Sequence, residues 1–166
     1  MKTIIQDKFL NTEQCMWLMR QDESVSYYRN KAKKPIEKFN SYYPWNHEYK
    51  GKNTIGNCPG WLVNRINNLA TEINGSVIDW IETVKWYSPC VGQRLHVDET
   101  SDETTLSCII YLNSDYDGGQ TYFEDGTVIM PGTGRALFFE GQHLKHGVTN
   151  LDHGTRYNIS CWLKKG

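Results

Sequence analysis

Three side chains in the second half of the chain, His96, Asp98 and His146, could bind one metal ion. His96 and Asp98 are two positions apart, and in an extended strand residues at this spacing project from the same face. His146 must then come from a different strand. Two imidazoles and one carboxylate on one side of an iron(II) ion leave the opposite coordination positions open for further reactants, as in non-haem iron sites.

An arginine downstream of these residues predicts an anion site. Arg156 begins the strand-like stretch Arg-Tyr-Asn-Ile-Ser-Cys-Trp, in which alternation puts Arg156, Asn158 and Ser160 on one face. If this face points into a small barrel, the buried guanidinium requires an anion, and its fork fits a carboxylate through two parallel hydrogen bonds. A dicarboxylate that chelates the metal at its other end would supply that carboxylate.

The remaining histidines leave an alternative open. His143 lies three residues before His146, so it could be the third ligand instead, or the two could form a zinc pair. On a strand these two residues would face opposite sides, which favours His146. His153 lies in a turn-like composition and His47 in a long loop, and we expect both to be exposed.

The cysteines form no recognisable zinc or disulfide pattern. They are odd in number and contain no C-x-x-C pair. A closed structural zinc site would need a fourth protein ligand, for which Cys90 and Cys161 are candidates, but no spacing favours either. We therefore expect five free thiols, mostly buried: Cys15, Cys58, Cys90, Cys108 and Cys161.

Two helices are predicted in the N-terminal part. An Asn-x-x-Gln capping pair predicts a helix over 11–21. After Pro59, apolar residues recur at helical spacing, and Gly75 supplies a left-handed stop. The segment 28–58 between them lacks periodicity, and we expect a loop that is functional or mobile.

From residue 77 onward the pattern changes to the period of two that is typical of strands. Many short strands separated by Gly-rich turns indicate a mostly β fold, a double-stranded β-helix or jelly roll, with the N-terminal helices packed on the outer sheet. We expect a single domain over 1–166, helical to about residue 75 and jelly roll over about 76–164. The predicted strands are 77–87, 104–112, 120–123, 127–130, 136–139 and 156–162.

The composition is that of a folded globular chain. Of 166 residues, 39% are hydrophobic and 22% charged, and the mean hydropathy of −0.62 comes with too many apolar residues for disorder. No segment approaches the ~20 apolar residues of a membrane span, and the N-terminus lacks the apolar core of a signal peptide. We therefore expect a cytoplasmic protein with no membrane partner.

The charges are segregated along the chain although the net charge is only −1. The segment 29–52 carries seven basic residues against two acidic ones, whereas 98–125 carries eight acidic residues and no Lys or Arg. Acidic, aromatic surroundings near Asp98 suit a cationic peptide better than a polyanion, which argues against nucleic acid as substrate. The alternative is that both runs are solvated loop surface.

Several stretches carry a likeness to a known family. They are Lys85-Trp86-Tyr87 leading through Gly92 to His96-Val97-Asp98, then Ile110-Tyr111-Leu112-Asn113, Gly118-Gly119-Gln120-Thr121-Tyr122-Phe123, Pro131-Gly132-Thr133-Gly134-Arg135-Ala136-Leu137-Phe138-Phe139, and His146-Gly147-Val148 through Gly154-Thr155-Arg156-Tyr157 to Trp162. From Trp86 to Trp162, about half of the chain, the sequence resembles the prolyl 4-hydroxylase branch of the Fe(II)/2-oxoglutarate dioxygenases.

The resemblance implies a role for each matching residue. His96, Asp98 and His146 would bind Fe(II), and Arg156 would hold the distal carboxylate of 2-oxoglutarate. These four residues would form the catalytic centre, and no side chain need act as nucleophile or general base.

Further residues match the family's pocket positions. Tyr87, Tyr111 and Ser160 match side chains that line the co-substrate pocket, although packing in the core or at the rim is an equal alternative for Tyr87. Trp162 matches an aromatic residue near the iron, where it would meet the substrate or simply pack in the core.

The segment 42–45 is a candidate lid. The family often closes its site with a mobile segment from this part of the chain, so Tyr43 and Trp45 would contact the substrate. The alternative is a disordered loop.

The resemblance also implies a reaction. Its co-substrates would be 2-oxoglutarate and O2, with ascorbate as a further cofactor, and an unactivated C–H bond would be hydroxylated with release of succinate and CO2. Our first choice of prime substrate, a proline in a peptide or protein, rests on the resemblance alone. The alternatives are a free amino acid or small metabolite, or a non-catalytic metal-binding jelly-roll module. The sequence leaves the oligomeric state open.

Overall fold

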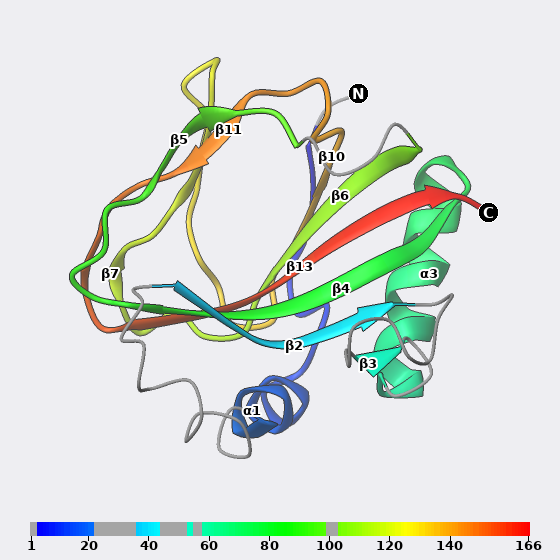
Figure 1. The fold of residues 1–166 in the computed structure, drawn as a ribbon, viewed down its shortest axis with the longest axis horizontal. Coiled ribbons are helices and arrows are strands. Elements are labelled where there is room, and N and C mark those ends of the chain that lie inside the picture. The colour runs from blue at the N-terminus through cyan, green and yellow to red at the C-terminus, as the bar shows by residue number, and fades with distance from the viewer. Residues whose placement is uncertain (1–2, 22–35, 44–52, 55–57, 99–102) are drawn as a thin grey trace.

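A computed structural model describes residues 3–21, 36–43, 53–54, 58–98 and 103–166 (Figure 1). A seven-stranded sheet runs in the order β1-β10-β6-β13-β4-β2-β3, a four-stranded sheet in the order β5-β11-β8-β9, and β12 pairs with β7. The two larger sheets face each other, which confirms the predicted jelly roll. The strand bounds are β1 Ile4–Gln6, β2 Ile36–Tyr43, β3 Asn53–Thr54, β4 Ser76–Tyr87, β5 Gln93–His96, β6 Thr104–Tyr111, β7 Asp117–Gly118, β8 Thr121–Phe123, β9 Val128–Ile129, β10 Ala136–Phe139, β11 His146–Val148, β12 Leu151–His153 and β13 Thr155–Lys165.

Both predicted helices form where the capping residues indicated. Helix α1 spans Thr12–Arg20, and its capping box is complete, because the Gln14 backbone donates to the Asn11 side chain and the Asn11 backbone donates to the Gln14 side chain. Helix α3 spans Gly60–Asn74 and ends at Gly75, which adopts φ of 75°. Glycine reaches this left-handed conformation at little cost, so the chain leaves the helix and enters β4 at once.

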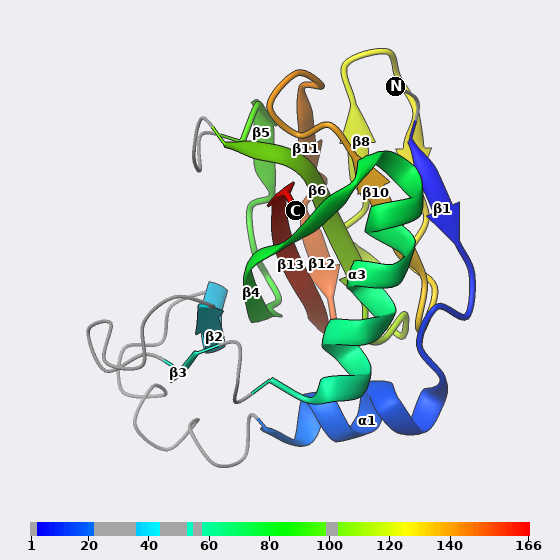
Figure 2. The same cartoon turned by 90° about the vertical axis from the view of Figure 1, so that its right-hand side faces the viewer.

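The helices cover the outer face of the seven-stranded sheet (Figure 2). Their buried apolar residues and those of the outer strand face form one core, which stabilises the sheet through burial of apolar surface. No helix in the described residues reaches the length and apolarity that crossing a membrane requires. The core comprises, from the helices, Cys15, Leu18, Leu62, Ile66 and Ala70, and from the strands chiefly Ile78, Ile81, Leu106, Cys108, Ile110, Phe138, Ile159, Cys161 and Leu163.

The inner face of the same sheet carries the polar residues. Strand β13 alternates between the two sides, so that Ile159 and Leu163 enter the helix-side core whereas Arg156, Asn158 and Ser160 line a cavity between the sheets. Strand β13 lies between β4 and β6 in the middle of the sheet. A central strand is held on both edges, so it fixes the cavity side chains rigidly.

Several predicted boundaries were wrong. The N-terminal part is not only helical, because β1, β2 and β3 extend the large sheet at its two edges. Segment 28–58, predicted to be a loop, contains β2 and β3 among its described residues. Strands β7 and β12, of two and three residues, also went unpredicted, whereas the equally short β8 and β9 were predicted because glycine-containing turns flank them.

Candidate functional site

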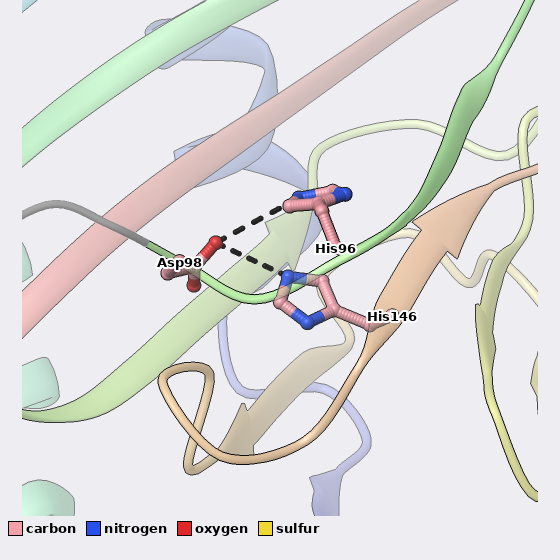
Figure 3. A group of neighbouring side chains, drawn as sticks. All are labelled: His96, Asp98 and His146. Carbon is pink, nitrogen blue, oxygen red and sulfur yellow. Dashed lines mark ion pairs between the residues drawn. The ribbon is translucent and has the colours of Figure 1, made fainter.

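The three metal-ligand candidates converge at one end of the four-stranded sheet (Figure 3). Antiparallel pairing of β5 with β11 sets His96 directly opposite His146. Asp98 follows β5, and its backbone N–H donates to the Gly141 carbonyl at 2.8 Å. The Nε2 atoms of His146 and His96 lie 3.2 Å and 3.8 Å from Asp98 Oδ1. The three ligand atoms all lie within 4.8 Å of one another, so one ion can touch all three.

Backbone carbonyls fix which imidazole nitrogen is available. Nδ1 of His96 lies 2.7 Å from the Arg94 carbonyl, and Nδ1 of His146 lies 2.8 Å from the Leu144 carbonyl. A carbonyl oxygen only accepts hydrogen bonds, so both Nδ1 atoms must carry hydrogen. Nε2 is then the ring atom that faces Asp98 in both histidines. Without a metal this nitrogen can carry a hydrogen and donate to the carboxylate, and in the neutral ring its lone pair is free to bind a metal, so the set of two nitrogens and one oxygen fits iron(II).

Asp98 is oriented by a hydroxyl that the sequence analysis missed. Ser107 of β6 donates to Asp98 Oδ2 at 2.7 Å, which leaves Oδ1 for the two imidazoles. Burial alone would raise the pKa of Asp98, but the hydrogen bond and positive charge of His146, the Ser107 hydroxyl and the charge of His96 together lower the pKa below its ordinary value. The carboxylate therefore stays ionised, as a metal ligand must.

A glycine is required beside this carboxylate. A Cβ at Gly141 would lie 2.2 Å from Asp98 Oδ2 and 2.2 Å from Ser107 Oγ. Any larger residue would push the carboxylate out of position.

Arg156 lies in the same cavity as the metal-ligand candidates. The cavity has a volume of about 270 Å³, and its lining includes His96, Asp98, His146 and Arg156. Arg156 is only 1% exposed. Its Nε donates to the Gly119 carbonyl at 3.0 Å, and one terminal nitrogen donates to Asn158 Oδ1 at 2.6 Å.

The buried guanidinium has no negative partner among the described residues. Trp86 provides a ring face 4.8 Å from its central carbon. Two titratable groups sit close by, and burial raises the pKa of both the Cys90 thiol and the Tyr116 phenol, so neither supplies a negative charge. Because a buried cation requires an anion, the site fits a carboxylate ligand.

Three further residues predicted for the site lie at or beside the cavity. Ser160 and Trp162 are part of its lining. Trp162 packs on Trp80 with ring centroids 4.9 Å apart. Tyr111 is fully buried next to Arg156, 5.5 Å from ring centroid to guanidinium carbon, and its hydroxyl pairs with the Thr121 hydroxyl.

The position predicted for Tyr87 is corrected by the structure. In the pairing of β4 with β13, Trp86 and not Tyr87 lies opposite Arg156, so Trp86 lines the cavity. Tyr87 faces the other side of β4, where its hydroxyl donates to Glu37 at 3.2 Å. Packing outside the pocket, the alternative reading of Tyr87, agrees with this position.

Other candidates lie away from the cluster or outside the described part of the chain. His143 precedes β11 in a turn and lines a separate surface pocket with Glu124 and Lys145. His153 is exposed, as predicted, and the five cysteines are free and buried. The structure describes neither His47 and Trp45 nor the side chain of Tyr43, so the lid stays a prediction.

Comparison with family models identifies the segment that holds these groups. Residues 84–164 match the model described as the 2OG-Fe(II) oxygenase superfamily. This segment contains all three metal-ligand candidates and Arg156.

Similar sequences and structures agree with this match. A 64-residue stretch is 41% identical to prolyl 3-hydroxylase 1 of Homo sapiens and of Rattus norvegicus, covering 34% of this chain and 9% of those proteins. A Pseudomonas putida prolyl-4-hydroxylase shares the fold with a TM-score of 0.66 and 20% identity, over 99% of this chain and 92% of that one. A Trichoplax adhaerens prolyl hydroxylase, solved with a hypoxia inducible factor peptide fragment, has a TM-score of 0.69 and 18% identity, over 98% and 83%.

Replacement of Ser107 tests how the carboxylate is held. Ser107→Ala removes the donor to Asp98 Oδ2, and loss of such an outer partner typically lowers metal affinity about 10- to 100-fold. We expect titration with Mn(II), an air-stable probe of the metal site, to show that the dissociation constant is at least tenfold larger than in the wild type. Ser114→Ala, which removes an exposed hydroxyl, is the control and should bind Mn(II) normally. Equal affinity in a folded Ser107→Ala protein would contradict the role of this hydroxyl.

Proposed function

We propose that the chain, whose residues 84–164 match the model of the 2OG-Fe(II) oxygenase superfamily, is an Fe(II)- and 2-oxoglutarate-dependent hydroxylase. The observation that carries the proposal is the single cavity shared by the His-Asp-His cluster and the buried Arg156. A small diacid can therefore meet a metal with one end and a guanidinium with the other.

The metal would be held by His96, Asp98 and His146, whose ligand atoms already face one another. When bound, Fe(II) would supply the centre at which 2-oxoglutarate and O2 react, giving succinate, CO2 and a hydroxylated product. The protein's own contribution is to fix both imidazole tautomers and to keep Asp98 ionised. The burial of His146 against Phe139 keeps water away from that side of the cluster.

Arg156 would orient the co-substrate by its distal carboxylate. The guanidinium has five N–H donors, and the contacts to Gly119 and Asn158 hold it in one orientation without using all of them. Donors therefore remain for a carboxylate. The Trp86 and Tyr111 rings exclude water around this pair, which strengthens its attraction.

A proline within a peptide or protein is the prime substrate that we propose. The curated relatives are named prolyl 3-hydroxylase 1, and one structural neighbour was solved with a peptide. The chain spans about a tenth of the length of those curated relatives, and the structural neighbours support the fold.

Removal of either imidazole tests the metal site. His96→Ala and His146→Ala should each abolish succinate formation from 2-oxoglutarate, since only two ligands would remain. His153→Ala, which removes an exposed imidazole, is the matched control and should keep wild-type turnover. Full activity in either of the first two variants would defeat the assignment.

Removal of the guanidinium tests the co-substrate anchor. Truncating one partner of a buried charge pair costs about 2–5 kcal/mol, so Arg156→Ala should raise the dissociation constant for 2-oxoglutarate by about thirtyfold or more. Titration of 2-oxoglutarate in the presence of Mn(II) measures this change. The exposed Arg20→Ala variant serves as control, and unchanged binding in a folded Arg156→Ala protein would contradict the role.

A peptide panel tests the substrate. The wild-type protein is incubated with Fe(II), 2-oxoglutarate, ascorbate and peptides that contain proline, with free proline in a parallel reaction. We expect a mass gain of about 16 Da, one oxygen atom, on a peptide prolyl residue, detected by mass spectrometry. Oxygen gain only on free proline would favour a small-molecule substrate, and succinate formation without gain on any proline would reject prolyl hydroxylation.

A further inference from the structure

The cavity has a second polar end, away from Arg156. Along β13 its lining runs from Arg156 through Ser160 to Trp162, and Glu82 of β4 and Lys38 of β2 line the cavity beside that strand. Glu82 lies on β4 opposite Ser160 of β13, so both side chains share the inner face of the sheet. Neither Glu82 nor Lys38 is used by the metal cluster or by the Arg156 anchor.

Glu82 is a buried carboxylate whose partner is largely in solvent. Its side chain is 7% exposed, whereas that of Lys38 is 59% exposed. Lys38 Nζ donates to Glu82 Oε1 at 3.0 Å, and no other described residue donates to this carboxylate. Within the described part of the chain, Glu82 Oε2 is thus an unused acceptor in the wall of the cavity.

The distance along the strand separates this acceptor from the co-substrate anchor. Glu82 lies four positions before Trp86, the residue opposite Arg156, which corresponds to about 13 Å at the rise of a β-strand. A dicarboxylate with one end on Arg156 and the other on the metal ligands brings two negative charges, which Glu82 repels. Asp98 is held by Ser107 of β6, whereas Glu82 lies on β4, on the other side of β13. The carboxylate therefore lies to the side of the path between Arg156 and the metal ligands, where a prime substrate can reach it.

We propose that Glu82 is a specificity-determining residue that binds a cationic nitrogen of the prime substrate, an ammonium or guanidinium group. The proposal rests on the proposed hydroxylase function and adds a substrate class to it. In the structure, Lys38 forms an ion pair with this carboxylate. An ion pair with one exposed, flexible partner contributes little stability, so a substrate cation can displace the lysine at low cost.

Binding of matched peptides tests the proposal without requiring turnover. Fluorescein-labelled, N-acetylated proline peptides that differ only by Lys or Gln beside the proline are titrated with protein, Mn(II) and 2-oxoglutarate, and anisotropy gives the dissociation constants. A hydrogen bond between charged groups predicts about tenfold tighter binding of the Lys peptide by the wild type. Glu82→Gln, which keeps the shape but removes the charge, should reduce this preference to about one.

Two further variants separate recognition from a structural role. Glu37→Gln makes the same chemical change in a buried carboxylate outside the cavity lining, and should keep the tenfold preference. Lys38→Gln removes the competing ammonium, and should increase the preference for the Lys peptide. If the Glu82 carboxylate only stabilised the fold, Lys38→Gln would not increase the preference for the Lys peptide.

The peptide series also identifies the source of the cation. A Gln peptide with a free N-terminus next to the proline, compared with its acetylated form, shows whether an α-ammonium replaces the lysine side chain. Equal or absent binding of Lys and Gln peptides by the wild type, or a preference that survives Glu82→Gln, overturns the proposal. Succinate formation by the wild type is measured separately, so failure of the hydroxylase function is distinguished from failure of the cation site.

Discussion

A buried positive charge that no described residue neutralises is the constraint on which the rest of the site depends. Moving a guanidinium out of water costs several kcal/mol, even in a relaxed protein interior. The Gly119 carbonyl, the Asn158 side chain and the Trp86 ring offset part of this cost, but they supply no opposite charge. Burial also keeps Cys90 and Tyr116 neutral. The cavity is therefore built for an anion, and its size and its metal-ligand cluster define which anion fits.

Antiparallel pairing is the means by which distant residues meet at that cavity. His96 and His146 are fifty positions apart, yet the β5–β11 register sets them opposite each other. Arg156 is positioned independently, in the centre of the other sheet. The site thus needs both sheets at a fixed separation, and the apolar cluster between them maintains it. In this cluster two residues of the small sheet pack with three of the large one: Phe123 and Ile129 with Tyr111, Leu137 and Phe139.

The sequence predicted these elements where a local signal was strong. The Asn11–Gln14 capping box, the glycine after α3 and the alternation of β13 each depend on neighbouring residues alone. For Tyr87 the resemblance left a pocket position and packing at the core or rim as equal alternatives, because the pairing of β4 with β13, which puts Trp86 opposite Arg156, is not visible in the sequence. Ser107 and Gly141 were missed because nothing local marks them, and their roles follow only from the contact with Asp98.

Strands β4 and β13 together separate recognition of the two substrates. The pair Trp86 and Arg156 forms one end of the inner face, and the pair Glu82 and Ser160 lies four positions away on the same two strands. Because the backbone holds side chains on one strand face at fixed intervals, a substitution at Glu82 or Lys38 does not need to disturb the carboxylate site at Arg156. Binding of the co-substrate can then stay constant while the prime substrate changes. The separation between Arg156 and Glu82 follows from the geometry of two paired strands.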